Sequence, residues 1–176
     1  MDFELKTLDL DGACAVRCDA LIVLVADGFK PGTGELGRLL AAALKAGDLD
    51  TKPGKLLPLY KPSGVAAGRV VLAGCGDGSP KAVRTAVQGA VGAVRATAAK
   101  RLGICFAGKA DAYAVRAAVM AVADASYVYT TTKPKAEARK LRDVLLAVPD
   151  AAAVRGAFAH GVAAVKGIET AKEWGN

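Results

Sequence analysis

The chain has 176 residues, of which 53% are hydrophobic, so it is long and apolar enough for one domain with a full core. Its formal net charge of +7 allows weak attraction to polyanions, and its aromatic content of 5% disfavours an aromatic cage for a sugar or a stacked base. No run approaches the roughly 18 apolar residues needed to span a bilayer, and the start Met1-Asp2-Phe3-Glu4 lacks the basic residues of a signal peptide, so we expect a cytoplasmic domain with no membrane partner.

The first third of the chain predicts two strands, then a loop, then a helix, and the second strand has the stronger signal. Residues 3–8 alternate in the manner of an edge strand, and residues 21–25, Leu-Ile-Val-Leu-Val, predict a central strand. The glycines and proline of residues 27–34 predict a loop. The spaced leucines of residues 35–46 then predict a helix that Gly47 ends.

The next segment predicts a hairpin-like pair of strands. Residues 55–60 look extended, but Pro58 cannot donate to a ladder, so we expect this strand at a sheet edge or with a bulge. A turn at residues 63–68 leads into the apolar run at residues 70–72. Because hairpin strands are antiparallel, the sheet is predicted to be mixed.

Residues 69–101 predict a strand, a glycine-rich turn and a long helix, which is half of a βαβ unit. Ser79 suits the N-cap, and Pro80 suits the first helical position because its missing N–H has no intrahelical partner there. Apolar residues recur every three or four positions from Val83 to Ala98, which predicts a helix of about six turns.

The last third predicts three strands and two helices. The strands are expected at residues 102–107, 127–132 and 142–148. Asp111 is a candidate N-cap for a helix to Ala125, and Asp150 for a helix running toward Trp174. We expect Trp174 to pack on this domain or on a segment that follows it.

The order of these elements predicts a single α/β domain over residues 1–176. Its expected architecture is three α/β/α layers around a mixed, mostly parallel sheet. The sequence contains no internal repeat and no low-complexity linker that would divide it.

The glycine-rich turn has two interpretations. Gly74, Gly76 and Gly78, followed by Ser79 at a helix N-terminus, form the geometry in which backbone N–H groups cradle an anion such as phosphate. The turn lacks the third glycine of the dinucleotide fingerprint at its proper spacing and the Gly-Lys-Ser/Thr of a P-loop, so a tight turn without a ligand is the alternative. The pair Gly32-x-Gly34 has the same two interpretations.

No catalytic or metal-binding constellation is visible in the sequence. His160 is the only histidine, and no neighbouring motif supplies a nucleophile for it, so we expect it to face solvent. The cysteines, at Cys14, Cys18, Cys75 and Cys105, contain no C-x-x-C pair. We expect four reduced thiols, no catalytic residue and no metal ligand in this chain.

A basic segment near residue 140 is a candidate nucleic-acid contact. Its cations are Lys133, Lys135, Arg139, Lys140 and Arg142, with one carboxylate among them. Such a segment would bind phosphates in a salt-sensitive and largely sequence-independent way. The alternative is a solvated loop at a strand edge.

Five short segments carry a family resemblance through their order and spacing. They are residues 19–23 (DALIV), 47–49 (GDL), 69–76 (RVVLAGCG), 126–129 (SYVY) and 161–176, which ends in AKEWGN. Together they resemble the N-terminal domain of the leucyl (cytosol) aminopeptidase family. That family usually has Gly-Leu-Gly where this chain has Gly74-Cys75-Gly76.

The resemblance implies a macro-domain-like, non-catalytic domain that helps to assemble and stabilise a homo-hexamer. The parent enzyme would release N-terminal amino acids from peptides with two divalent metals, Mn²⁺ or Zn²⁺, held in a C-terminal catalytic domain. No catalytic or metal-binding residue of the family falls on this chain, so the chain alone should be inactive. The last residues, about 170–176, resemble the start of the connection to that catalytic domain. In some bacterial members this region also takes part in DNA binding.

Two other functions remain as alternatives. Residues 19–23 resemble the opening strand of a macro domain, which suggests a stand-alone module that binds ADP-ribose or a related nucleotide. The Asn and the glycine run that usually follow are replaced by residues 24–29, LVADGF. The second alternative is a DNA-binding accessory domain, suggested by the basic segment and the net charge, whose affinity would fall steeply with salt.

Overall fold

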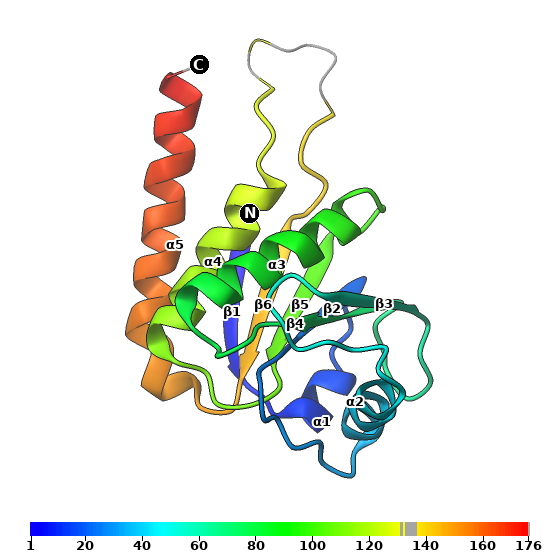
Figure 1. Ribbon diagram of the computed structural model, residues 1–176. Coiled ribbons are helices and arrows are strands. Elements are labelled where there is room, and N and C mark those ends of the chain that lie inside the picture. The colour runs from blue at the N-terminus through cyan, green and yellow to red at the C-terminus, as the bar shows by residue number, and fades with distance from the viewer. Residues whose placement is uncertain (131, 133–136, 176) are drawn as a thin grey trace.

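A computed structural model of the chain describes residues 1–130, 132 and 137–175, which form one α/β structure (Figure 1). The strands are β1 (Asp2–Thr7), β2 (Ala20–Val25), β3 (Leu56–Tyr60), β4 (Arg69–Gly74), β5 (Arg101–Phe106) and β6 (Asp143–Val148). The helices are α1 (Leu10–Cys14), α2 (Glu35–Ala46), α3 (Pro80–Arg95), α4 (Ala112–Ser126) and α5 (Ala151–Trp174).

The strands form one mixed sheet in the order β1-β6-β5-β2-β4-β3. Every neighbouring pair is parallel except β3 and β4, which form the predicted antiparallel pair. Strand β2 lies between β5 and β4, as its continuous apolar run predicted, and all six of its residues are buried. The predicted fold class, a mostly parallel sheet between helical layers, is confirmed.

The sheet divides the hydrophobic interior into two cores, one on each face (Figure 1). Ile22 packs in the core formed with α3, α4 and α5, whereas its neighbours Leu21 and Val23 pack in the core formed with α1 and α2. This alternation follows from the strand geometry, in which successive side chains point to opposite faces. The chain therefore has the three α/β/α layers that its element order predicted.

Strand β3 lies at the sheet edge, and Pro58 occupies the outward-facing row of its backbone. The Gly74 N–H donates to the Lys55 carbonyl at 2.9 Å, and the Lys61 N–H donates to the Gly68 carbonyl at 3.0 Å. Residues 55, 57, 59 and 61 therefore face β4, so the backbone of Pro58 faces the open edge. The N–H that proline lacks would have pointed to solvent, which explains why proline is tolerated here.

The strand predicted at residues 127–132 is wrong. Residues 127–130 and 132 form no strand, and residue 131 lies outside the described part of the chain. The β-branched and aromatic composition of this segment was a local signal, but a strand also needs a partner edge. Strand β5 already pairs with β2 and β6, so the segment finds no partner there and leaves the sheet beyond α4.

One helix boundary and one short helix also differ from the prediction. Helix α3 ends at Arg95 instead of Ala98, because the hydroxyl of Thr97 donates to the Val94 carbonyl at 2.6 Å and closes the last turn. The short helix α1 was not predicted. Its signal was Asp9, whose carboxylate accepts a hydrogen bond from the Gly12 N–H at 2.8 Å as an N-cap.

Asp19 ties the start of β2 to the start of β5. Its Oδ2 accepts hydrogen bonds from the backbone N–H groups of Arg101 and Lys100, both at 2.8 Å. These bonds favour the charged carboxylate and lower the pKa of Asp19 below its ordinary value of 3.8. The carboxylate therefore stabilises the fold most above that ordinary value.

We expect Asp19→Asn to flatten the acid limb of the stability curve. A group with a lowered folded-state pKa contributes stability that is present above its unfolded pKa and is lost as the pH falls through the folded pKa. The measurement is the free energy of urea unfolding at a series of pH values from neutral to below 3.8, for the parent chain and the variant. An acid limb with the same slope in both proteins would contradict this role.

Candidate functional site

A cleft of about 490 Å³ lies where the carboxyl ends of β2, β4 and β5 meet. In open α/β sheets, ligands commonly bind outside the carboxyl ends of the strands, so this cleft is the first place to look for a site. The predicted anion-binding turn, Gly74 to Ser79, follows β4 and contributes to its wall together with Asp27 and Phe29 from the loop after β2.

The N–H groups of this turn are bonded within the chain. Five of them donate to oxygens of the chain itself: Gly74 to Lys55, Cys75 to Val25, Gly76 to Thr51, Gly78 to Cys75 and Ser79 to Asp77. In addition, the Ser79 hydroxyl accepts from the Ala82 N–H at 3.4 Å as the N-cap of α3. An anion could bind here only by replacing some of these bonds. The anion site stays a prediction, and these contacts favour the tight-turn alternative.

Backbone geometry accounts for two of the glycines without a ligand. Gly76 and Gly78 have positive φ angles of 52° and 72°, a region that side chains with a Cβ rarely adopt. The turn therefore requires glycine at these positions for its own conformation.

Carboxylates of the chain lie at the starts of α2, α3 and α4. The Asp77 carboxylate accepts from the Ser79 N–H at 2.9 Å, and that bond lowers the pKa of Asp77. The Asp111 carboxylate accepts from the Tyr113 N–H at 2.8 Å at the start of α4. On the other face of the sheet, the Asp11 carboxylate packs against Gly34, the N-cap of α2. Internal anions thus lie where a phosphate would bind.

The cleft itself is acidic. Asp27, Asp77 and Asp111 line it, and Lys109 is the cation among the described lining residues. A pyrophosphate would meet like charges at short range, which costs binding energy. This charge distribution argues against the nucleotide-binding alternative at this position.

The environment of the Cys75 thiol in the cleft does not favour its reaction as a nucleophile. Cys75 is buried, and burial, with smaller contributions from Asp27 and Asp77, raises its pKa to about 11. A thiol with this pKa is protonated near neutral pH, whereas the reactive form is the thiolate. Burial likewise raises the pKa of Cys18 to about 11 and that of Cys105 to about 12. All four cysteines are free thiols.

The described residues offer no ligand set for a metal ion. Among residues 1–130, 132 and 137–175, no three His, Cys, Asp or Glu side chains come together at a distance suitable for coordination. His160 is exposed on α5, as predicted. The divalent metals that the family resemblance implies therefore do not fit this part of the chain.

The described residues between α4 and β6, which are 127–130, 132 and 137–142, form the arm, and they lie beside the C-terminal end of α5 (Figure 1). The arm contains three residues of the predicted basic segment, Arg139, Lys140 and Arg142. Lys133 and Lys135 lie outside the described residues. Lys140 is paired with Glu137 at 3.0 Å, and Arg142 is exposed at the start of β6.

Arg139 of the arm is held by an ion pair with Glu169 of α5. Its two terminal guanidinium nitrogens lie 2.5 Å and 3.0 Å from the two carboxylate oxygens, in a bidentate arrangement. The two side chains are only 19% and 23% exposed. Of the predicted nucleic-acid contacts, Arg139 is thus neutralised and partly buried by its own chain.

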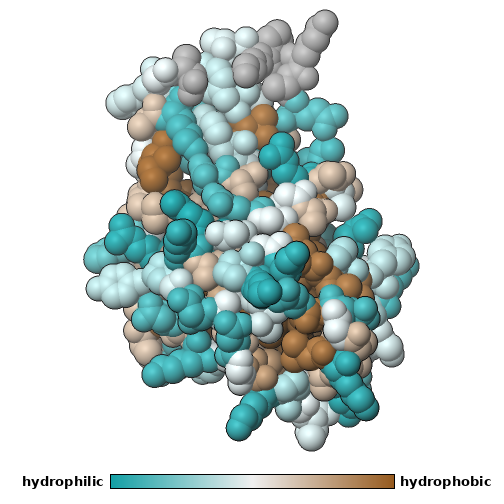
Figure 2. All heavy atoms as spheres, viewed as in Figure 1, coloured by the Kyte–Doolittle hydropathy of each residue, from teal (hydrophilic) through white to brown (hydrophobic). Residues whose placement is uncertain are grey.

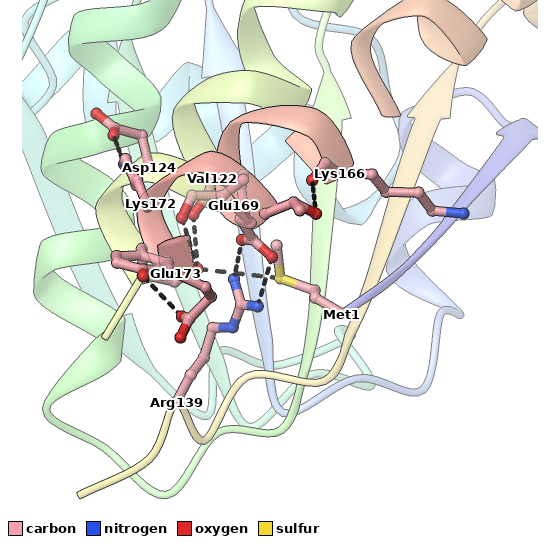
Figure 3. A network of polar contacts seen from close by, with 12 residues as sticks. Met1, Val122, Asp124, Arg139, Lys166, Glu169, Lys172 and Glu173 are labelled. Carbon is pink, nitrogen blue, oxygen red and sulfur yellow. Dashed lines mark hydrogen bonds and ion pairs between the residues drawn. The ribbon is translucent and has the colours of Figure 1, made fainter. Parts of the chain in front are cut away.

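Further polar contacts connect the last turns of α5 to the end of α4 and the base of the arm (Figure 3). The Tyr127 hydroxyl donates to Glu173 at 2.7 Å. Lys172 donates to Asp124 at 2.9 Å, which lowers the pKa of Asp124, and the Lys172 ammonium lies 4.8 Å from the centre of the Tyr127 ring. These contacts, with the Arg139 pair, fix the direction in which α5 ends. Sequence analysis missed them because the partners lie 30 to 48 positions apart.

Trp174 does not pack on the domain. It lies in the last turn of α5 and is 87% exposed, so the expectation that it packs on this domain is wrong. A large exposed aromatic side chain at the end of a fixed helix is a typical contact residue for another protein surface.

We expect Arg139→Ala to release the arm from α5. The variant leaves the partly buried Glu169 carboxylate without its bidentate partner, and we expect a loss of about 1–2 kcal/mol in the free energy of unfolding. Hydrogen exchange at residues 137–141 should become faster. Lys140→Ala is the matched control, because its exposed pair with Glu137 should change stability by about 0.5 kcal/mol or less. Equal effects of the two substitutions would contradict the assigned role of Arg139.

Comparison with known proteins identifies similar sequences over the whole chain. The family model "Cytosol aminopeptidase family, N-terminal domain" matches residues 29–136. A probable cytosol aminopeptidase of Albidiferax ferrireducens is 53% identical over 176 residues, which are 100% of this chain and 37% of that protein. One of Methylibium petroleiphilum is 36% identical, again over 100% of this chain and 37% of that protein. The chain thus spans about a third of the length of these relatives.

Solved structures share the fold at lower sequence identity. A mutant tomato leucine aminopeptidase superposes with a TM-score of 0.71 at 16% identity, covering 96% of this chain and 36% of that one. The bottromycin maturation enzyme BotP in complex with Mn superposes with a TM-score of 0.63 at 20% identity, covering 89% of this chain and 31% of that one. Both matches involve about a third of a larger protein.

Proposed function

Because the chain belongs to the cytosol aminopeptidase family, as its N-terminal domain, we propose that it is the non-catalytic part of a metal-dependent peptidase that releases N-terminal amino acids from peptides. The observation that supports this most is the difference in length between this chain and its relatives. Relatives that match all of this chain are almost three times as long, which leaves room for a separate catalytic domain.

The location of chemistry in the parent follows from the same proposal. The two divalent metals, Mn²⁺ or Zn²⁺, and the catalytic side chains would belong to the C-terminal catalytic domain, which is the first partner of this domain. No helix among the described residues is long and apolar enough to cross a membrane, and we propose a cytoplasmic location for the parent.

The experiment compares three proteins in one assay. A leucyl amide is incubated, with Mn²⁺ and separately with Zn²⁺, with each of three proteins: residues 1–176 alone, the remainder of the parent alone, and the full-length parent. We expect hydrolysis by the full-length parent, its loss on chelation, and none by residues 1–176. Chelator-sensitive hydrolysis by residues 1–176 would overturn the proposal, as would a full-length parent that shows no peptidase activity with either metal.

We propose that the domain also contributes to assembly of a homo-hexamer. Two surfaces support this role: the end of α5 with its exposed Trp174, and the part of the sheet beside β1, where a shallow groove of about 620 Å³ includes Glu4, Lys6, Arg101 and Leu145. Sedimentation of the full-length parent with and without residues 1–176 tests the proposal. A parent that still sediments as a hexamer of the same stability without the domain would contradict it.

Binding of DNA is a second candidate function. The exposed cations that support it are on helices α3, α4 and α5 more than on the arm. Hydrophilic residues cover much of the face on which α3 and α4 lie (Figure 2). The exposed cations of α3, α4 and α5 are Lys81, Arg84, Arg95, Arg116, Arg155 and Lys166. Affinity for a DNA duplex should then fall steeply with salt, and Arg84→Gln should reduce the slope. Affinity that does not change with salt would exclude this function.

A further inference from the structure

A small cavity of about 230 Å³ lies at the opposite end of the sheet from the acidic cleft. The C-terminal end of α3, the start of β5 and the returning half of the arm enclose it. Its floor consists of Val91, Val94 and Leu102, which are 2%, 5% and 1% exposed. Leu141 of the arm also lines the cavity. The lining therefore includes branched aliphatic side chains from α3, β5 and the arm.

The charged rim of the cavity is left with one unpaired positive charge. Arg139 is paired with Glu169, and Lys140 with Glu137. The remaining rim cation is Arg95, whose guanidinium donates one long hydrogen bond, 3.4 Å, to the Ala125 carbonyl. No carboxylate among the described residues pairs with Arg95. Its fork of N–H donors is thus available at the mouth of an apolar cavity.

We propose that this cavity binds a small carboxylate with a branched aliphatic body. The carboxylate would accept hydrogen bonds from the Arg95 guanidinium, the geometry in which arginine recognises carboxylates. The branched body would lie against Val91, Val94 and Leu102 and displace water from apolar surface. This site goes beyond the proposed function and does not depend on the peptidase assignment.

The size and charge of the cavity exclude larger anions as its natural ligand class. Pockets for drug-sized ligands typically measure roughly 300–1,000 Å³, so a cavity of about 230 Å³ suits a ligand of a few carbon atoms. A nucleotide would not fit, and a phosphate dianion would find a single unpaired cation and an apolar floor. A monoanion with an apolar body matches both properties.

Binding should also affect the arm, because its residues 137–141 line the cavity. Arg139 anchors the same stretch to α5, so a bound ligand would lie between α3 and a segment fixed to the end of α5. Hydrogen exchange at residues 137–141 should become slower when the site is occupied.

The test is a titration of isotopically labelled residues 1–176 with 4-methylpentanoate, followed by NMR. We expect saturable shifts of the amides of Val91, Val94, Leu102 and Leu141. The neutral isostere 4-methylpentanamide should bind the parent chain about tenfold more weakly than the acid does. The acid should bind the Arg95→Gln variant about tenfold more weakly than it binds the parent chain. In both cases a charge-assisted hydrogen bond is lost. Arg84→Gln, a change of another exposed arginine on α3, is the matched control and should leave the affinity unchanged.

Three results would overturn the proposal. The first is the absence of saturable shifts at the cavity residues. The second is equal affinity for the acid and its amide. The third is the same loss in Arg84→Gln as in Arg95→Gln, which would indicate unspecific attraction to the basic surface. The urea midpoint of each variant shows that a loss of binding is not a loss of folding; because Arg95 is exposed, we expect its midpoint to stay close to that of the parent chain.

Discussion

Replacing Gly74 with alanine is expected to lower the free energy of unfolding by about 3 kcal/mol, because the new methyl group would press on backbone atoms. A Cβ at Gly74 would lie 2.5 Å from the carbonyl oxygens of Asp50 and Lys52 and from the carbonyl carbon of Thr51. These atoms belong to the loop that also accepts the Gly76 N–H, so the loop cannot move away without breaking that bond. Urea unfolding measures the loss.

Gly92→Ala is the matched control for this substitution. Gly92 lies on the exposed side of α3 with nothing within 4 Å of the added carbon, so alanine should stabilise the helix by about 0.5–1 kcal/mol. The comparison also separates the two interpretations of the glycine-rich turn. A Gly74 variant as stable as the parent chain, but unable to bind an anion that the parent binds, would favour the anion site over the tight turn.

Replacing Ile104 with alanine is expected to cost about 2–5 kcal/mol, the range for removing a large aliphatic side chain from a packed core. Ile104 is completely buried on β5, between Ile22 of β2 and Leu146 of β6 in the sheet register. All three side chains belong to the core formed with α3, α4 and α5. The space left by the missing atoms is bounded by strands on both sides and cannot close easily.

Leu145→Ala is the control for Ile104. Leu145 lies on the neighbouring strand but is only half-buried, in the groove beside β1, so its loss should cost about 1 kcal/mol or less. Thermal and urea unfolding of both variants give the comparison. Similar losses at the two positions would mean that the core on the α3 side is not the main source of stability.

The fold could be predicted where local chemistry and tertiary context agree. The apolar run of β2 marks a strand that is buried on both faces, and the sheet places it between two neighbours. Ser79, Asp111 and Asp150 were predicted as N-caps, and each accepts the expected backbone hydrogen bond. Where they disagree, as at residues 127–132, strand propensity alone was misleading because strand β5 already pairs with β2 and β6 and offers no edge to this segment.

The candidate sites were harder to predict because their properties depend on which group accepts each hydrogen bond, and some of these acceptors are far away in the sequence. The spacing of Gly74, Gly76 and Gly78 correctly indicates a turn, but their N–H acceptors come partly from Thr51 and Lys55, which no local pattern connects to the turn. The basic segment was visible, whereas the partner of Arg139 lies 30 positions away. The cavity beside Arg95 exists only because α3, β5 and the arm meet in three dimensions.

The position of Pro58 has a consequence for any assembly that holds several copies of this domain close together. An open strand edge at high local concentration invites a neighbour to continue the sheet, which leads to disordered aggregates. In β3 the outward row is interrupted at its middle residue, so no uninterrupted ladder can form between two such edges. At the β3 edge, crowded copies can therefore meet through side-chain surfaces without continuing the sheet from one copy to the next.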